Sequence, residues 1–474
     1  MQRLSILLLA LSLAALACSA LPSQPATTAP GEVETVVAAT LTALSPTALV
    51  PTATTDTPVT TEPPTAAPEA TATSTPEPAP AGPTCSVTYS EGATLFCLAA
   101  DGTPTVLATA PAGLGISGPG ISPDGQWVAY MVGAPGTPTE LWVVGADPAL
   151  NPPHILVASA NVPSPDPANV WFPRTFAWRP GTHSLLFDTR WEPVGGIQGP
   201  GEYINNDLWL ADVATGAVSL VLGAEVGGNY AVSPDGNFVA FSYATGFGLV
   251  NADGSNLRRD VVTFPAILTY SEYLFKPDLY WQADSLAFNA AVPSRDPMAP
   301  DASATIYHVG TDGIVGTVMT LPGNFVIGGL IKPMFSPDGN YAVYSLLQPG
   351  SSQIEDVHLL RLAGAAISDT IVDARPVLSG WGWSSNSDHF VYASTPGDVP
   401  GSGYDLGIEG PIRAWAPGLT QIIHLRWQDP TTFYFIGQIN SSGWSLYRLT
   451  LGAEPVLVAS GLSQQAALDA RPAP

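Results

Sequence analysis

Short apolar segments separated by turn-forming residues run from about residue 85 to residue 460. Three of them share one pattern, in which Ser-Pro-Asp-Gly is followed by aromatic and aliphatic residues (122–130, 233–241 and 336–344). In such a turn, proline fixes the first central position, aspartate caps the backbone, and glycine adopts a conformation that a Cβ atom would disfavour. Because the flanking residues suit pleated, half-buried strands, the pattern predicts β-hairpins.

Weaker copies of this hairpin fill the gaps between the three strong ones. Each begins with a tryptophan, as in Trp178-Arg179-Pro180-Gly181. A second apolar hairpin follows within the repeat. The residues before the seven turns, at spacings of 44 to 57 residues, are Ile121, Trp178, Val232, Trp281, Phe335, Trp383 and Trp427. Periods of this size are typical of propeller blades or solenoid turns.

Two hairpins per period build a four-stranded antiparallel blade, and blades that close into a ring leave no exposed sheet edge. The repeated Ser-Pro-Asp-Gly turn with its aromatic neighbours resembles the WD-repeat-like β-propeller family found in the periplasmic Tol-system protein and in prolyl-oligopeptidase-type enzymes. The resemblance covers about residues 85–460. It implies an all-β β-propeller of four-stranded antiparallel blades and says almost nothing about the ligand.

The number of blades follows from the turns. Seven complete blades start at the seven turns, and residues 85–110 supply the second, third and fourth strands of another. A C-terminal segment near residues 465–468 can supply its missing first strand. We therefore expect residues 85–474 to form eight blades, with the ring closed by N- and C-terminal strands. The alternative is seven blades with the N-terminal strands stacked outside.

Two cysteines flank the first predicted hairpin. Residues 87–89 and 94–96 have strand character, and a three-residue loop containing Gly92 between them would place Cys85 directly opposite Cys97. Opposed residues in an antiparallel pair have the short separation that a disulfide needs. The pattern therefore predicts a Cys85–Cys97 disulfide, and the alternative is two buried free thiols.

The N-terminal region has the features of an export signal. Residues 1–17 contain Arg3 followed by an apolar stretch of about 13 residues, which is too short to span a bilayer. The sequence Ala15-Leu16-Ala17-Cys18 resembles a bacterial lipobox, although that family usually has leucine where this chain has Ala15. The resemblance implies a signal peptide that ends before a lipidated Cys18. The alternative is an ordinary secretory signal and a secreted protein.

Residues 18–84 are rich in threonine, proline and alanine and contain neither lysine nor arginine. Such a segment buries too little apolar surface to offset its ordering entropy, so we expect a disordered tether. At about 3.1 Å per residue it could extend roughly 200 Å. These features predict a chain that is exported to the bacterial cell envelope and lipid-anchored on the outer side of the membrane.

Alternation of the strands places the first–second and third–fourth turns on one face and the remaining connections on the other. The long insertions are expected on the second face, at 146–174, 190–206, 292–303, 348–355 and 395–404. Binding residues concentrate on loops held by a rigid scaffold, and hot spots favour aromatic residues and arginine. The candidate binding residues are Trp171, Arg174, Arg190, Trp191, Glu192, Tyr203, Arg295 and Tyr404. The alternative is that the aromatic residues only pack the loops against the rim.

Charge and motifs exclude several functions. With 15 basic and 39 acidic residues the net charge is −24, which argues against a nucleic-acid partner. No Gly-x-Ser-x-Gly elbow occurs, the six histidines have no metal-ligand spacing, and the repeated aspartates are explained by their turns. We therefore predict no catalytic residues, metal or cofactor.

The predicted function is a monomeric, membrane-tethered extracytoplasmic propeller that binds a protein, peptide or glycan through its loop-rich face. One alternative is a lyase or glycosidase with carboxylates at the central channel. The other is a structural component of the envelope.

Overall fold

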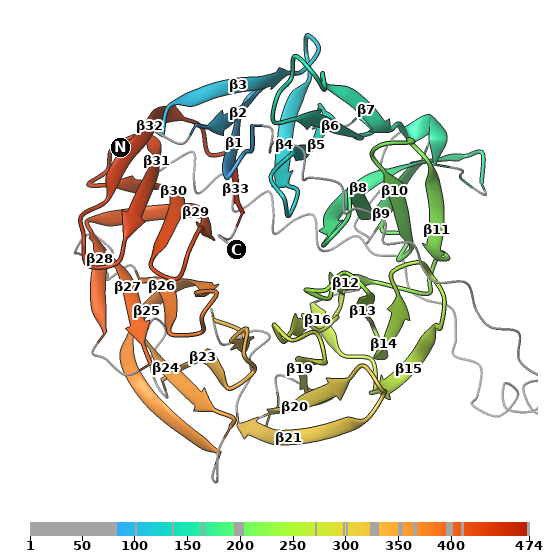
Figure 1. Cartoon of the computed structure of the whole chain (residues 1–474). Coiled ribbons are helices and arrows are strands. Elements are labelled where there is room, and N and C mark those ends of the chain that lie inside the picture. The colour runs from blue at the N-terminus through green and yellow to red at the C-terminus, as the bar shows by residue number, and fades with distance from the viewer. Residues whose placement is uncertain are drawn as a thin grey trace, which may run out of the picture. The chain divides into compact units, whose positions relative to one another are not determined.

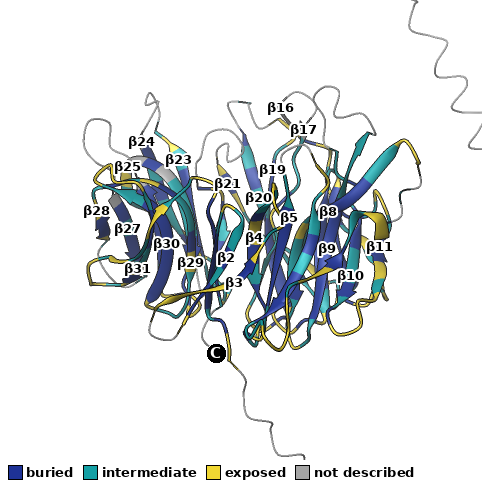
Figure 2. Ribbon diagram, turned by 90° about the horizontal axis from the view of Figure 1, so that it is seen from above, coloured by how far each residue is buried: buried dark blue, intermediate teal, exposed yellow. Residues whose placement is uncertain are grey.

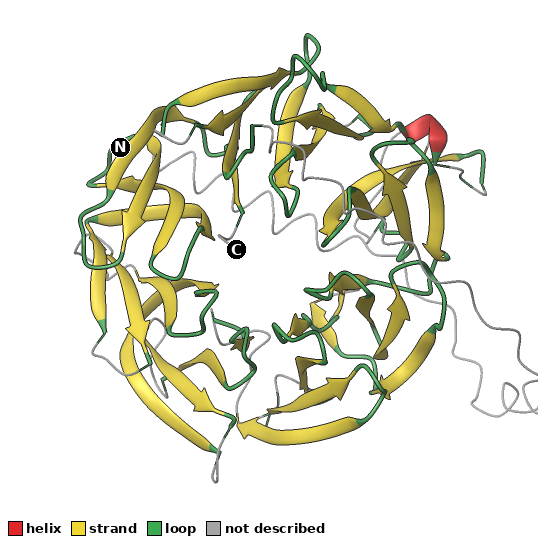
Figure 3. Cartoon of the chain, viewed as in Figure 1, coloured by secondary structure: helices red, strands yellow, loops and turns green. Residues whose placement is uncertain are grey.

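Four-stranded antiparallel sheets arranged around a central axis make up the part of the chain that the computed structural model describes (Figures 1 and 3). The described residues are 83–99, 102–134, 137–162, 164, 166–193, 203–270, 273–296, 299, 302–322, 331–348, 354–363, 367–394, 402–408 and 412–471. The predictions for residues 1–17, for Cys18 and for almost all of the tether lie outside them. Within these ranges no helix has the length and hydropathy needed to cross a membrane.

Eight blades form the ring, as predicted, and each has its first strand innermost. From the inner to the outer strand, four blades are β33 (Ala467–Ala470), β1 (Val87–Glu91), β2 (Thr94–Leu98), β3 (Pro104–Thr109); β4 (Gly115–Ile121), β5 (Trp127–Gly133), β6 (Glu140–Gly145), β7 (His154–Val157); β8 (Asn169–Arg179), β9 (Ser184–Pro193), β10 (Leu208–Asp212), β11 (Val218–Leu222); and β12 (Asn229–Val232), β13 (Phe238–Tyr243), β14 (Gly246–Asn251), β15 (Arg258–Thr263).

The other four blades are β18 (Tyr280–Trp281), β19 (Ala287–Pro293), β20 (Ser303–Gly310), β21 (Val315–Pro322); β22 (Met334–Phe335), β23 (Tyr341–Leu347), β24 (Ile354–Arg361), β25 (Ser368–Trp383); the second half of β25 with β26 (His389–Ser394), β27 (Ser402–Gly407), β28 (Arg413–Pro417); and β29 (Leu419–Trp427), β30 (Thr432–Ile439), β31 (Trp444–Thr450), β32 (Val456–Leu462). β25 serves two blades, because its first half pairs with β24 and its second half with β26. A small hairpin of β16 (Leu268–Tyr270) and β17 (Tyr273–Leu274) precedes β18.

The two ends of the described chain close the ring, as the sequence predicts. β33 pairs with β1, with Val87 opposite Ala470 and Ser90 opposite Ala467, so the C-terminal strand completes the blade that the N-terminal strands begin. Asp469 also accepts a hydrogen bond of 2.9 Å from the Ile121 backbone N–H of the next blade. The seven-blade alternative is therefore wrong.

Cys85 and Cys97 are joined by a disulfide with 5.9 Å between their Cα atoms. The predicted register of this hairpin is wrong, however, because Thr88 lies opposite Cys97. The strands extend further than expected and leave a two-residue turn in which Gly92 has a φ of 56°. Cys85 therefore lies before β1, where its backbone N–H donates to the Gly125 carbonyl at 2.8 Å.

The tryptophans before the turns join neighbouring blades. The indole Nε1 of each donates to a backbone carbonyl of the preceding blade, so a buried polar group is satisfied where two apolar sheets meet. The four bonds are Trp178 to Gly120 at 2.9 Å, Trp281 to Ala231 at 2.9 Å, Trp383 to Met334 at 2.8 Å and Trp427 to Gly382 at 3.3 Å.

The aspartates of the Ser-Pro-Asp-Gly turns have the structural role that the sequence predicts. Asp235 accepts hydrogen bonds from the Ser233 hydroxyl at 2.5 Å and from the Asn237 N–H at 3.0 Å. Asp338 makes the same two bonds within its own turn. Burial opposes ionisation of both carboxyls, but these hydrogen bonds lower the pKa of each below its usual value.

The two faces of the ring differ, and Figure 2 shows them edge-on. We call the face with the first–second and third–fourth turns the turn face, and the opposite face the loop face. The β16–β17 hairpin lies on the loop face, whereas Arg471, directly after β33, donates to the Pro123 carbonyl in a turn of the turn face at 3.4 Å. One predicted insertion is misplaced: the residues between β6 and β7 join a third strand to a fourth and belong to the turn face. The sequence did not predict the strand β7 (His154–Val157), and this strand divides the insertion expected at 146–174.

Candidate functional site

The β8–β9 hairpin carries five of the predicted binding residues on strands and not on loops. Trp171 lies opposite Trp191 in this hairpin, and only 9% of Trp171 is exposed because it packs into the core beneath. Trp191 contacts Tyr203 edge-to-face, with 4.9 Å between the ring centroids. The structure thus brings three of the predicted aromatic residues together, with one of them in the core.

Two predicted arginines of this hairpin bind carboxylates of the same hairpin. Arg174 forms an ion pair with Asp188, whose carboxylate is fully buried and also accepts hydrogen bonds from Thr175. Burial raises the pKa of Asp188, and the Arg174 charge opposes that rise. Arg190 donates to Glu192 at 3.0 Å.

The remaining two predicted residues lie on other blades. Tyr404 is part of β27, where its ring stacks on Tyr392 with 5.5 Å between centroids. Arg295 lies just beyond β19, in the connection to β20. The eight residues therefore do not form one continuous site, and a binding role for any of them remains a prediction.

A pocket that the repeat pattern does not predict lies on the loop face, between the β18–β21 blade and the blade that begins with β22. Its cavity volume is only about 20 Å³, and it reaches about 350 Å³ only when all the space at its open mouth is included. The ends of β19, β20 and the segments before β18 and β22 supply its walls. The lining residues are Phe275, Asp278, Tyr280, Ala291, Pro293, Ala304, Lys332 and Pro333.

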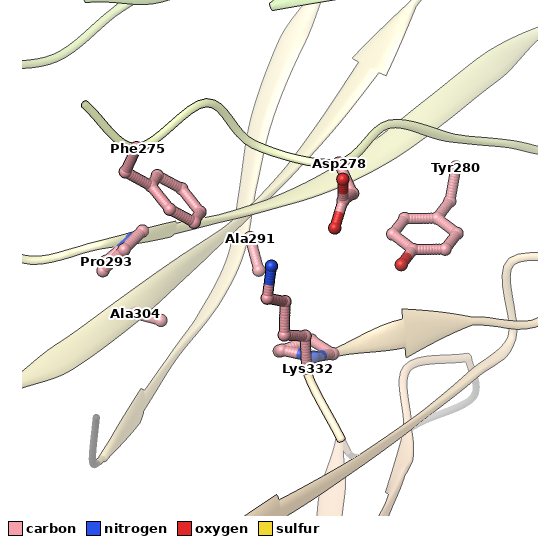
Figure 4. A pocket seen from close by; sticks show the side chains of 8 residues that line it. Phe275, Asp278, Tyr280, Ala291, Pro293, Ala304 and Lys332 are labelled. Carbon is pink, nitrogen blue, oxygen red and sulfur yellow. The ribbon is translucent and has the colours of Figure 1, made fainter. Parts of the chain in front are cut away.

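Three polar groups converge in this otherwise apolar pocket. Figure 4 shows the Lys332 ammonium, the Asp278 carboxylate and the Tyr280 hydroxyl pointing into the same space. Burial, and then the nearby Asp278 charge, raise the pKa of Tyr280, so its hydroxyl stays protonated and can donate. The pocket therefore presents a cation, an anion and a neutral donor beside apolar walls.

The two charged groups have no partner within the part of the chain that the structure describes. Neither Lys332 nor Asp278 makes a hydrogen bond or ion pair there. Lys276, the only other lysine of the chain, in contrast donates to Asn206 at 3.0 Å. Both residues are exposed at the edge of the pocket, so water solvates their charges and a ligand can reach them.

This arrangement suits a ligand with a carboxylate next to an N–H group and an apolar side chain. The ammonium of Lys332 would bind the carboxylate, and Asp278 would accept from the N–H. Phe275 and Pro293 offer an apolar surface on one side. Lys332 and Asp278 are 54 residues apart, and only the contact between adjacent blades brings them together, so the repeat pattern gave no sign of the pocket.

Within the described ranges, no group of three histidine, cysteine, aspartate or glutamate side chains is arranged to hold a metal ion. Three of the histidines pair with aspartates: His183 with Asp124 at 2.6 Å, His358 with Asp369 at 3.0 Å and His389 with Asp405 at 3.0 Å.

Comparisons with known proteins find distant structural similarity. No protein-family model matches the chain, and no curated protein matches it significantly. Among solved structures, the β-propeller domain of the trilobed protease from Pyrococcus furiosus is similar, with a TM-score of 0.43 and 12% identity over 73% of this chain and 97% of that one. An oligogalacturonate lyase in complex with manganese has a TM-score of 0.41 and 15% identity over 69% and 89%. A structure assigned as TolB from Agrobacterium tumefaciens has a TM-score of 0.31 and 14% identity over 70% and 88%.

Proposed function

We propose that this propeller is an extracytoplasmic binding scaffold that takes up the C-terminal end of a peptide or protein in the loop-face pocket. The carboxylate of the partner would bind Lys332, its last N–H would bind Asp278, and its last side chain would pack against Phe275. The observation that carries the proposal is the pair of exposed opposite charges, Lys332 and Asp278, at the edge of an apolar pocket.

The attachment of the N-terminal segment supports the choice of this face. The Cys85 N–H is bonded to Gly125, in the turn between β4 and β5, so the chain enters the ring at the turn face. The loop face is opposite to that entry. A tether on residues 18–84 would therefore join the ring at the face opposite to the pocket and leave the pocket open to a partner.

The cavity at the central channel supports binding over the enzymatic alternative. Carboxylates paired across the channel would favour a glycosidase or lyase. On the turn face, however, the described residues that line the channel cavity include tryptophans, prolines and alanines and no acidic side chain.

The test uses immobilised peptides that differ only at their C-terminus. One set ends in a free carboxylate after an apolar residue, and the matched set ends in an amide. We expect the purified protein to bind the free acids more tightly by about 2- to 5-fold, since Lys332 is exposed and an ion pair screened by water contributes roughly 0.2–1 kcal/mol.

Variants of the two lysines provide the control. Lys332→Met should abolish the preference for the free acid, whereas Lys276→Met should keep it, because Lys276 is bonded to Asn206 and does not line the pocket. Equal binding of acids and amides, or an unchanged preference for the free acid in Lys332→Met, would show that this pocket does not bind a peptide carboxylate.

A further inference from the structure

The loop-face pocket has an apolar floor and a charged edge. Three of its lining residues, Pro293, Ala304 and Pro333, are buried, and we call them the floor. Lys332 and Asp278, in contrast, are exposed at the edge. A group that enters the pocket past these two charges therefore meets the carbon surface of the floor.

The floor is held in place by strand pairing and by the core. Pro293 and Ala304 lie opposite each other in β19 and β20, and Ala304 also lies opposite Leu321 of β21. Only 1% of Ala304 is exposed, because it packs into the core cluster of this blade and the next. The ring of Tyr280, in the wall, contacts Phe335 with 5.5 Å between the centroids. Because close-packed interiors of this kind yield little, the floor cannot retreat to admit a larger group.

The enclosed part of the pocket has room for one small group. Its volume is about 20 Å³, and a single water molecule needs roughly 10–15 Å³ of such space. A buried water molecule also needs roughly two to four polar partners, which the three floor side chains do not offer. A methyl group has a similar size and needs no partner, so it suits this space better than water does.

The walls are arranged like the substituents of a terminal residue. In Figure 4, Phe275 and the floor residues Pro293 and Ala304 lie on one side of the Lys332 side chain, and Asp278 lies on the other. With the carboxylate on Lys332 and the N–H on Asp278, the remaining substituent of the terminal carbon would point toward Phe275 and the floor. The side chain of the last residue is therefore the group that the floor would select.

We propose that the floor selects a partner whose last residue is alanine. The methyl group of that residue would fill the enclosed volume, whereas glycine would leave it empty. The side chains of valine, leucine and phenylalanine exceed this volume and would have to stay in the open mouth. This inference rests on the proposed function and names the class of partner that the same pocket takes up.

Peptides that differ only in their last residue test the proposal on the wild-type chain. The series ends in glycine, alanine, valine, leucine or phenylalanine, each as the free acid, and NMR titration of the full chain gives the affinities. The alanine peptide should bind about 4-fold more tightly than the glycine peptide, which is the effect of burying one additional carbon group. The three larger residues should bind more weakly than alanine. Equal affinities for alanine and glycine, or an affinity for leucine that equals or exceeds that for alanine, would overturn the proposal.

The amides of the same peptides separate this inference from the proposed function. If no free acid binds more tightly than its amide, the proposed function is wrong and the selection of alanine is wrong with it. If every free acid is preferred to its amide and alanine has no advantage over glycine, only the selection of alanine is wrong.

Two variants that fill the pocket show where the selection takes place. Ala304→Val adds two methyl groups at the floor, and Ala291→Val adds them at a half-buried position of the wall. Each should remove the advantage of alanine over glycine, whereas Ala374→Val, at an exposed position of another blade, should keep it. Thermal melting identifies a variant that fails to fold, and the other filling variant then gives the answer. Wild-type selectivity in a folded filling variant would place the selection elsewhere and overturn the proposal.

Discussion

The ion pair of the β8–β9 hairpin gives a prediction whose size follows from burial. Replacing Arg174 with methionine removes the charge that compensates Asp188 and keeps an unbranched side chain. The Asp188 side chain has no exposed surface, and 26% of the Arg174 side chain is exposed. Removing one partner of a buried pair costs about 3–5 kcal/mol. Because Arg174 keeps some exposure, we expect a loss near the lower end, about 3 kcal/mol.

Arg190 on the same hairpin provides the matched control. Its partner Glu192 is 17% exposed and Arg190 itself is 35% exposed, so water screens the pair. Arg190→Met should therefore cost about 1 kcal/mol or less. Equilibrium urea unfolding at pH 7, followed by tryptophan fluorescence, compares the two variants. Losses that agree within about 0.5 kcal/mol would refute the argument from burial.

The pH dependence of the same variant supplies a second check. Burial raises the pKa of Asp188 although Arg174 opposes it, so the folded chain binds this proton more readily than the unfolded chain. The contribution of Asp188 to stability therefore falls as the pH rises from the ordinary carboxyl pKa through the raised native value. Arg174→Met removes the opposing charge, so its deficit relative to wild type should shrink as the pH falls from 7 toward 5. A deficit that stays constant over this range would contradict the assignment.

Ending the chain after Leu462 deletes β33 and should abolish the cooperative thermal transition, whereas a chain lacking only its last three residues should melt as wild type does. Cys97→Ser should lower the free energy of unfolding by about 3 kcal/mol on the chain-entropy model for so short a loop, and a urea midpoint that does not change would contradict this. Trp281→Phe leaves the Ala231 carbonyl without its indole donor and should cost about 1–3 kcal/mol; a loss below about 0.5 kcal/mol would show that the bond contributes little. Cys18→Ser should release the protein into the medium, and retention in the membrane fraction would count against lipidation.

The fold could be predicted because the blades repeat the same kinds of turn and strand residues. The Ser-Pro-Asp-Gly turns identify hairpins without reference to distant residues, and the missing first strand of the N-terminal blade requires a C-terminal strand. The register of the first hairpin was missed because Ser90 and Glu91 extend the strand that was expected to end before them. Ser90 and Glu91 pair with Leu95 and Thr94 of β2, which is favoured over leaving them in a three-residue loop.

The candidate site was harder to predict because it depends on contacts between blades. Trp171 and Arg174 were placed in a loop, whereas β8 is long enough to include both. Asp278 lies in the segment before β18 and Lys332 in the segment before β22. Neither residue belongs to a sequence motif or to the repeating turns. Their proximity follows from the packing of adjacent blades, which single-sequence patterns do not encode.

The most direct test of the loop-face pocket uses the fact that the chain has only two lysines. Reductive methylation with ¹³C-formaldehyde keeps their charge and gives one signal for each side chain, Lys276 and Lys332. Titration with peptides that end in a free carboxylate should shift the Lys332 signal saturably and leave that of Lys276 in place. A Lys332 signal that does not move, or two signals that move equally, would contradict the proposed site.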